Sequence, residues 1–312
     1  MKHKNQTQTI KIGTRGSKLA IWQANHVANL LQNYYPALKV EIIKIKTTGD
    51  KILDVPLAKV GGKGLFVKEI EQALIDGTID LAVHSMKDVP TEQMEGLILG
   101  AIMEREDPRD VLISNNKLKL NQLPHNSLIG TSSLRRQCQL LQISPGTKIV
   151  QLRGNLDTRI RKLREEKLTA IIVAAAGVHR LGLKELIADY LAPQQFLPAI
   201  GQGAIGIETQ SNNYKILDLI QPLNHPETQI AVSAERSFLK KLEGGCQVPI
   251  AAFAKVSNGK VSIEGLVGSI DGKKIIKDFT DGKIEEAEEL GFILADKLIS
   301  LGAKDILKEV IG

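Results

Sequence analysis

The sequence predicts an α/β protein, because two observations coincide along the first two thirds of the chain. Short apolar runs of strand length alternate with longer segments whose apolar residues recur at helical spacing. Each apolar run also ends in a loop rich in glycine, serine or arginine, as expected where a strand passes into a helix. Strands that are joined through helices predict sheets that are largely parallel.

The first unit illustrates this pattern. Residues 10–12 alternate as a strand would, and the helix that follows has Leu19, Trp22 and Val27 on one face. Further strands are expected at 40–45, 81–83, 128–130, 149–152 and 170–174.

The chain changes character from about residue 226. A helix is expected over 231–242, followed by short alternating strands with Asn-Gly and Asp-Gly turns at 258–259 and 271–272. Helices are expected again from 285 to 310. This part therefore predicts a small antiparallel sheet covered by helices.

Two segments are expected to separate domains. Residues 104–110 are charged and contain a proline, and we interpret them as a hinge. Residues 192–203, with prolines and glycines, form a second break. A chain of 312 residues has room for two or three domains with cores of their own.

The composition restricts the class of protein. The polar residues 1–7 lack the apolar region of a signal peptide, and no apolar run reaches the roughly 18 residues needed to span a bilayer. We therefore expect a cytoplasmic protein without a membrane segment. Two cysteines are too few for a disulfide scaffold, and the six histidines lack metal-ligand spacing, so no metal is expected.

The formal net charge of +6 leaves two kinds of partner open. Nucleic acid is one, although aromatic residues make up only 4% of the chain and no basic arm is present. A small anionic ligand fits this composition at least as well.

Six arginines occupy similar places, in or just after loops at predicted strand ends. They are Arg15, Arg135, Arg136, Arg153, Arg159 and Arg180. Ligands of α/β sheets bind beyond the carboxyl ends of strands, and helix N-termini and guanidinium groups both favour anions. Any single arginine could simply be solvated, but six in equivalent places predict a polyanion site. The pattern does not distinguish carboxylates from phosphates.

Asp88 follows the buried strand 81–83 and stands beside Lys87. Among so many cations, its carboxylate is expected to stay ionised. It could stabilise a developing cation and transfer a proton, or serve only in an ion pair with Lys87 or an Asx turn. His84 is adjacent to Ser85, but adjacency along a strand does not bring two side chains together, so no serine hydrolase is predicted.

The two cysteines and a glycine-rich loop have different expected roles. Cys246 follows two glycines, so its thiol is expected to be exposed in a turn, either for chemistry or incidentally. Cys138 lies in a helical stretch and is expected to pack in a core. Lys63, in the loop 61–64, is either a solvated or a functional residue.

Together these segments resemble the porphobilinogen deaminase (hydroxymethylbilane synthase) family along almost the whole chain, from residue 12 to residue 310. The matching runs are GTR at 13–15, PLAKVGGKGLF at 56–66, AVHSMKDVP at 82–90, GTSSLRR at 130–136, RGN at 153–155 and EGGCQVP at 243–249. The last of these runs is close to diagnostic.

The resemblance implies the domain organisation. Two α/β lobes like those of a periplasmic binding protein would enclose a cleft, with a small α+β domain after them. Domain 1 would be discontinuous, at 1–105 with 203–222, and would contain the catalytic aspartate. Domain 2, at 106–202, would supply the arginine-rich binding face, and domain 3, at 223–312, the cysteine loop.

The resemblance also implies an activity in haem biosynthesis. Four porphobilinogen molecules would condense stepwise, head to tail, with loss of ammonia, and hydrolysis would then release linear hydroxymethylbilane. Cys246 would hold a dipyrromethane cofactor through a thioether. Asp88 would be the catalytic residue, acting on the azafulvenium cation that forms when ammonia leaves.

Each pyrrole brings an acetate and a propionate, so the resemblance interprets the basic residues as carboxylate ligands. The implied cofactor ligands are Lys87, Ser133, Arg135 and Arg136. The implied ligands of substrate and growing chain are Arg15, Ser17, Lys63, Arg153, Arg159 and Arg180.

We expect a monomer whose partner is this small substrate, without nucleic acid or membrane. Two alternatives stay open. A two-lobed binding protein for a small polyanion would bind reversibly and without a covalent adduct. A nucleic-acid-binding protein is suggested by charge alone.

Overall fold

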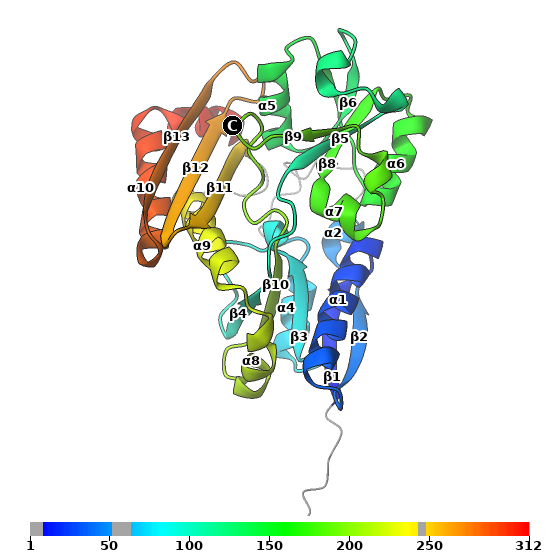
Figure 1. Ribbon diagram of the computed structural model, residues 1–312, viewed down its shortest axis with the longest axis vertical. Coiled ribbons are helices and arrows are strands. Elements are labelled where there is room, and N and C mark those ends of the chain that lie inside the picture. Colours follow the sequence, from blue (N-terminus) through cyan, green and yellow to red (C-terminus); the bar gives the residue numbers. More distant parts are fainter. Residues whose placement is uncertain (1–8, 52–63, 243–247, 312) are drawn as a thin grey trace, which may run out of the picture.

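The computed structural model describes residues 9–51, 64–242 and 248–311. They form two five-stranded sheets and one three-stranded sheet, each accompanied by helices (Figure 1). The five-stranded sheets define lobe 1, at the bottom of Figure 1, and lobe 2, at the upper right. The three-stranded sheet defines the C-terminal domain at the upper left.

Lobe 1 has the strand order β2-β1-β3-β10-β4. Its strands are β1 (Thr9–Arg15), β2 (Lys39–Ile45), β3 (Leu81–Ser85), β4 (Leu97–Ile102) and β10 (Ile205–Gln210). Its helices are α1 (Lys18–Tyr34), α2 (Thr48–Lys51), α4 (Lys68–Ile75) and α8 (Tyr214–Ile220). The side chain of Ser17 caps α1 by accepting a hydrogen bond from the amide of Ala20 at 3.2 Å.

Lobe 2 repeats this plan with the order β7-β6-β8-β5-β9. Its strands are β5 (Asp110–Ser114), β6 (Leu128–Gly130), β7 (Lys148–Val150), β8 (Ala170–Ala174) and β9 (Asp189–Leu191). Its helices are α5 (Leu134–Ile143), α6 (Leu156–Glu165) and α7 (Ala175–Arg180). Ser133 caps α5 and accepts from the amide of Arg136 at 3.4 Å.

The two lobes exchange strands. The chain enters lobe 2 through β5, after a first crossing at 103–109, and returns to lobe 1 through β10, after a second crossing at 192–204. Both strands are antiparallel to their neighbours, whereas β1–β2, β1–β3, β6–β7 and β6–β8 are parallel. The expectation of largely parallel sheets is therefore wrong for half of these pairs, because β5 and β10 arrive from the other lobe and not through a helical crossover.

The C-terminal domain consists of β11 (Ile250–Ser257), β12 (Lys260–Gly268) and β13 (Ile275–Lys283), with helices α9 (Pro226–Lys241), α10 (Ala287–Ser300) and α11 (Ala303–Ile311). All strand pairs in it are antiparallel, as predicted. Asn258 and Gly259 have φ angles of 51° and 71°, which are those of the predicted two-residue hairpin turn. The expected arrangement of two α/β lobes and a small C-terminal domain is thus confirmed.

Cys138 packs in a core, as predicted. Its side chain is fully buried in α5, and a Cβ added to Gly268 of β12 would lie 3.1 Å from its Sγ. Lobe 2 and the C-terminal domain are therefore in close contact here. Burial raises the pKa of this thiol to about 12, which makes it unreactive at neutral pH.

None of the helices in the described parts of the chain combines the length and the apolar character that crossing a membrane requires.

Candidate functional site

Lys87 and Asp88 lie in a 3₁₀ turn, Met86–Asp88, directly after β3. The amide of Met86 donates to the carbonyl of Ala204 at 3.0 Å, so the turn is attached to the end of the second crossing. The Met86 side chain is buried, and a Cβ at Gly206 would lie 2.3 Å from its Sδ. Glycine at 206 is therefore required for this packing. The turn lies at the carboxyl end of a parallel strand, where ligands of α/β sheets bind.

Arg135 and Arg136 lie in the first turn of α5, and both are buried. Arg135 donates from Nη2 to Asp110 Oδ2 at 2.7 Å, and Arg136 donates from Nη2 to Asp110 Oδ1 at 2.7 Å. Burial would raise the pKa of Asp110, but the two arginines lower it to about 2. The fully buried Asp110 therefore stays ionised and partly neutralises both guanidinium groups.

Gln202 also donates to Asp110, from Nε2 to Oδ1 at 3.0 Å, and to the carbonyl of Pro108 at 2.7 Å. It joins the second crossing to the first. Sequence reasoning missed both Asp110 and Gln202. The signal for Asp110 was a carboxylate at the start of an apolar strand, immediately after the charged hinge.

Arg159 of α6 lies in the same electrostatic neighbourhood. Its Nε donates to the carbonyl of Gly154 at 2.8 Å, and Gly154 has a φ of 110°, a conformation that favours glycine. Burial and the charge of Arg136 lower the pKa of Arg159 to about 10, while Asp88 acts in the opposite direction. Arg153 makes no hydrogen bond or ion pair with other residues of the described ranges, and burial lowers its pKa.

Lys87 interacts with residues of both lobes. Burial lowers the pKa of Lys87 to about 8; Asp88 opposes this shift, and Arg136 adds to it. Lys87 and Asp88 come from lobe 1, whereas Arg136 and Arg159 come from lobe 2. Electrostatic interactions therefore link Lys87, Asp88, Arg136, Arg153 and Arg159 into one cluster with residues from both lobes.

Arg15 and Arg180 lie outside this cluster. Arg15 is paired with Asp50, and its guanidinium carbon stands 4.3 Å from the centre of the Phe66 ring. Arg180 of lobe 2 donates to the carbonyl of Gly203 at 2.7 Å. Its guanidinium carbon lies 5.9 Å from the Trp22 ring of lobe 1, so Arg180 lies where the two lobes meet.

Ser17 and Ser133 occupy helix N-termini, as described above. Cys246 and Lys63 lie outside the described residues. Along the chain, α9 ends at Lys241 and β11 begins at Ile250, so these two elements flank the cysteine segment.

His84 and Ser85 have separate partners, consistent with the rejection of a serine hydrolase. His84 Nε2 lies 3.1 Å from Glu208 Oε2 in the interior of lobe 1, and Gln23 Nε2 donates to Ser85 Oγ at 2.9 Å. Among the described residues, no group of His, Cys, Asp and Glu could hold a metal ion.

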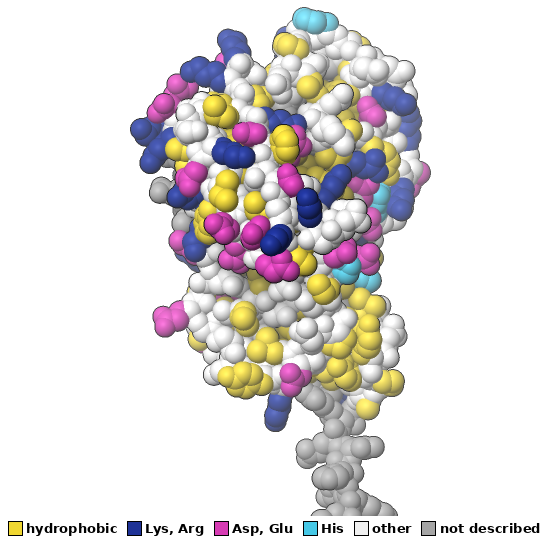
Figure 2. Space-filling view, turned by 60° about the vertical axis from the view of Figure 1, so that its left-hand side comes forward, with side chains coloured by type: hydrophobic (Ala, Val, Ile, Leu, Met, Phe, Trp, Pro, Cys, Tyr) yellow, Lys and Arg dark blue, Asp and Glu magenta, His cyan; other side chains and the backbone are white. Residues whose placement is uncertain are grey.

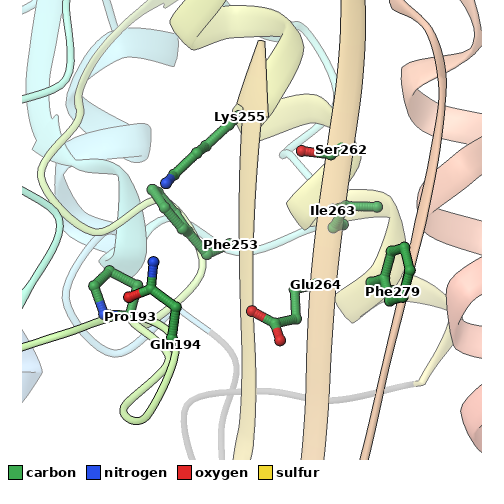
Figure 3. A pocket seen from close by; sticks show the side chains of 8 residues that line it. All are labelled: Pro193, Gln194, Phe253, Lys255, Ser262, Ile263, Glu264 and Phe279. Atoms are coloured by element: carbon green, nitrogen blue, oxygen red, sulfur yellow. The ribbon is translucent and has the colours of Figure 1, made fainter. Parts of the chain in front are cut away.

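Two shallow, open cavities lie on the described parts of the molecule. One, of about 240 Å³, lies on the open face of the C-terminal sheet, where Phe253 and Lys255 face Pro193 and Gln194 (Figure 3). The other, of about 260 Å³, lies between lobe 1 and α9. Neither cavity includes a predicted site residue.

The charge on one face of the molecule is mixed. In Figure 2, Lys and Arg side chains alternate with Asp and Glu over the upper part, and no single basic patch covers this face. Arg135 and Arg136 of the predicted site donate inward to Asp110, and Arg180 donates to the carbonyl of Gly203 where the lobes meet.

The fold and this site define a class: a two-lobed α/β protein with an aspartate and several cations that interact across the two lobes. Comparison with known proteins narrows the class. The family model described as "Porphobilinogen deaminase, dipyromethane cofactor binding domain" matches residues 10–218, and "Porphobilinogen deaminase, C-terminal domain" matches residues 229–300. The chain belongs to the porphobilinogen deaminase family.

Curated relatives agree with this assignment. A porphobilinogen deaminase of Geobacter metallireducens is 56% identical over 301 residues, which cover 96% of this chain and 94% of the relative. One of Geotalea uraniireducens is 55% identical over 97% of this chain and 95% of the relative. Among solved structures, the periplasmic aliphatic sulphonate binding protein SsuA from Escherichia coli is 13% identical with a TM-score of 0.41, covering 76% of this chain and 71% of that chain.

The predicted family, activity and cofactor are thereby confirmed. As a member of this family the protein is a transferase that acts on porphobilinogen, and residues 10–218 match the dipyrromethane cofactor binding domain. The residues present fit such a cofactor, since Lys87, Arg153 and Arg159 offer positive charge beside Asp88 to a group rich in carboxylates.

Proposed function

We propose that Asp88 is the catalytic carboxylate of this transferase, and that the cations around it bind the carboxylates of substrate and cofactor. The observation that carries this proposal is the distribution of charge between the lobes. Asp88 and Lys87 of lobe 1 interact electrostatically with Arg136 and Arg159 of lobe 2. The carboxylate of Asp88 therefore lies among cationic side chains that come from both lobes.

The reaction explains why a single ionised carboxylate is useful there. Porphobilinogen loses ammonia at each condensation, so positive charge develops on its pyrrole ring, and a nearby carboxylate stabilises that charge. Asp88 would take the proton from the ring carbon at which the new carbon–carbon bond has formed, and would pass that proton to the amine of the next porphobilinogen as it leaves as ammonia. The two transfers cancel, and the carboxylate is ready for the next round.

The cations would position the carboxylates. We propose that the cofactor is held by Lys87, Ser133, Arg135 and Arg136, and that substrate and chain are held by Arg15, Ser17, Lys63, Arg153, Arg159 and Arg180. Arg135 and Arg136 would act at longer range, since Asp110 already accepts hydrogen bonds from both. When bound, dipyrromethane supplies the free α-carbon to which the first substrate is joined.

We propose Cys246 as the attachment point, through a thioether. We also propose the division into domain 1 (1–105 with 203–222), domain 2 (106–202) and domain 3 (223–312). The pairing of β10 with β3 and β4 supports the discontinuity of domain 1.

The enzyme would work as a cytoplasmic monomer without membrane or nucleic acid.

The test is the intact mass of the purified protein under denaturing conditions, compared with Cys246→Ser. We expect a mass increment of two linked pyrrole units in the parent protein and none in the variant. A parent protein that lacks the increment would be incubated with porphobilinogen and weighed again. A continued absence of any adduct would contradict the proposal and favour reversible anion binding.

A further inference from the structure

Helix α9 connects the C-terminal domain to both lobe crossings through Glu235. This fully buried carboxylate pairs with Arg105 of the first crossing at 2.7 and 3.1 Å. It also accepts from the amide of Gly201 in the second crossing at 2.7 Å, and from the amide of Ala254 in β11 at 2.9 Å. The position of α9 relative to the lobes is therefore fixed.

The next residue of the helix, Arg236, contacts the segment directly after Asp88. Its Nη1 donates to the carbonyl of Val89 at 3.1 Å, and its Nη2 donates to the carbonyl of Pro90 at 2.5 Å. A guanidinium group presents its donors in a rigid plane, so two bonds to consecutive carbonyls fix the direction of the backbone as well as its position.

These two bonds complete the attachment of the Asp88 turn. On the amino side, the amide of Met86 is bound to the carbonyl of Ala204. On the carboxyl side, the attachment comes from α9, a different part of the fold. Asp88 thus lies between two attachments. One is the bond from Met86 to the second crossing, and the other is the pair of bonds from Arg236 of the C-terminal domain.

The burial of Arg236 indicates that its hydrogen bonds to Val89 and Pro90 offset the cost of withdrawing the guanidinium from water. Burial lowers the pKa of this guanidinium, and Glu208 of β10 opposes the shift. Withdrawing a guanidinium from water is costly unless it is hydrogen-bonded, and here the bonds are made to backbone carbonyls beside Asp88.

We infer that Arg236 is a positioning residue for Asp88: it holds the carboxylate at a fixed place relative to the helix that leads into the cysteine segment. This inference rests on the proposed role of Asp88. Each new pyrrole must meet a carboxylate in the same geometry, and a misplacement of about 1 Å can cost on the order of 100-fold in rate.

The test uses the cofactor-loaded enzyme with Arg236→Met, which keeps much of the aliphatic length of the side chain but loses its donors. We expect kcat to fall by roughly 10- to 100-fold, while KM stays within about twofold and the covalent mass increment is unchanged. Lys240→Met is the matched control. Lys240 lies one turn further along α9 and lines the same cavity as Arg236, without a bond to Val89 or Pro90. Its kcat should equal that of the parent enzyme.

A double-mutant cycle with Asp88→Glu separates positioning from general structural damage. If Arg236 acts through Asp88, the double variant should be no slower than Asp88→Glu alone, within about twofold. If the two losses multiply, or if Arg236→Met keeps kcat within twofold of the parent value, the inference is wrong.

Two further variants keep the test decisive. Should Arg236→Met fail to fold, Arg236→Gln replaces it under the same criteria, since an amide can still reach one carbonyl. Asp88→Asn examines the proposed function separately: if that variant keeps near-normal turnover, the role of Asp88 fails. If Asp88→Asn is inactive while Arg236→Met is not impaired, only the inference about Arg236 fails.

Discussion

The guanidinium of Arg15 is paired with the carboxylate of Asp50. Arg15 was expected to bind carboxylates of the pyrrole chain, yet in this structure it binds one from the protein. Burial works against the charged form of Asp50, but hydrogen bonds from Arg15 and Thr47 lower the pKa of this carboxyl overall. An anionic substrate therefore has to compete with Asp50 for the guanidinium.

Asp50→Asn should weaken this competition. We expect KM for porphobilinogen to fall by about 2- to 5-fold with little change in kcat, in keeping with the roughly 1 kcal/mol that a part-exposed ion pair contributes. Steady-state kinetics at constant ionic strength measure the change. Asp305→Asn, which removes an exposed carboxylate on α11, is the control. An increase in KM would mean that Asp50 supports the site and does not compete for it.

Asp110→Asn should destabilise the fold. The variant leaves Arg135 and Arg136 buried without a negative partner, and breaking a buried ion pair of this kind costs about 3–5 kcal/mol. Urea unfolding of the two proteins gives the difference in the free energy of unfolding. A loss below 1 kcal/mol would contradict the importance of this pair.

The same carboxyl predicts a dependence of stability on pH. The folded-state pKa of Asp110, about 2, lies below its ordinary value of 3.8. Its contribution to stability is therefore fully present above about pH 5 and is lost as the pH falls from about 4 to 2. The unfolding midpoint of the parent protein should fall more steeply over that interval than the midpoint of Asp110→Asn. Parallel curves would argue against this assignment.

Lys87, a proposed ligand of the cofactor, predicts a dependence of cofactor assembly on pH. Because its pKa is lowered to about 8, it loses its charge as the pH rises through 8, and its attraction for a carboxylate disappears. We expect the porphobilinogen concentration that half-saturates cofactor assembly on the apo protein to rise by roughly threefold or more between pH 7 and pH 9. Lys87→Arg keeps its charge across this range and should remove most of the rise. Identical profiles for the two enzymes would exclude Lys87 as its source.

Asp88→Asn tests the catalytic carboxylate. The variant should keep its covalent mass increment and bind porphobilinogen, while kcat falls on the order of 10²- to 10⁴-fold because proton transfer and charge stabilisation are both lost. Asp76→Asn, an exposed position at the end of α4 in the same lobe, should behave as the parent enzyme. Near-normal turnover of Asp88→Asn would remove the proposed role.

Local features of the fold were predictable. The strand period gave β1, β2, β3, β6, β7 and β8 of the two lobes but not β4, β5, β9 or β10. The Asn-Gly pair at 258–259 gave its hairpin turn, and a helical setting placed Cys138 in a core. Each of these depends on residues that are close in sequence, so their signal is carried by spacing alone.

Contacts between distant segments were not predictable from spacing. Asp110 is separated by 25 residues from Arg135, and Gln202 lies 92 residues from Asp110. Arg236 reaches Val89 across 147 residues. Spacing likewise missed the strands β5 and β10, whose antiparallel direction follows from their crossing between the lobes.

The sequence by itself therefore determined the α/β class, many of the elements, the family and the residue types of the site, since these follow from local hydrogen bonding and from matching motifs. Only the tertiary structure decided which charges meet. It paired Arg135 and Arg136 with Asp110, Arg15 with Asp50, and the backbone beyond Asp88 with Arg236. The physical reason is that a charge is stabilised by whichever partner the packing of the lobes brings within hydrogen-bond distance, and no periodicity in the chain records that partner.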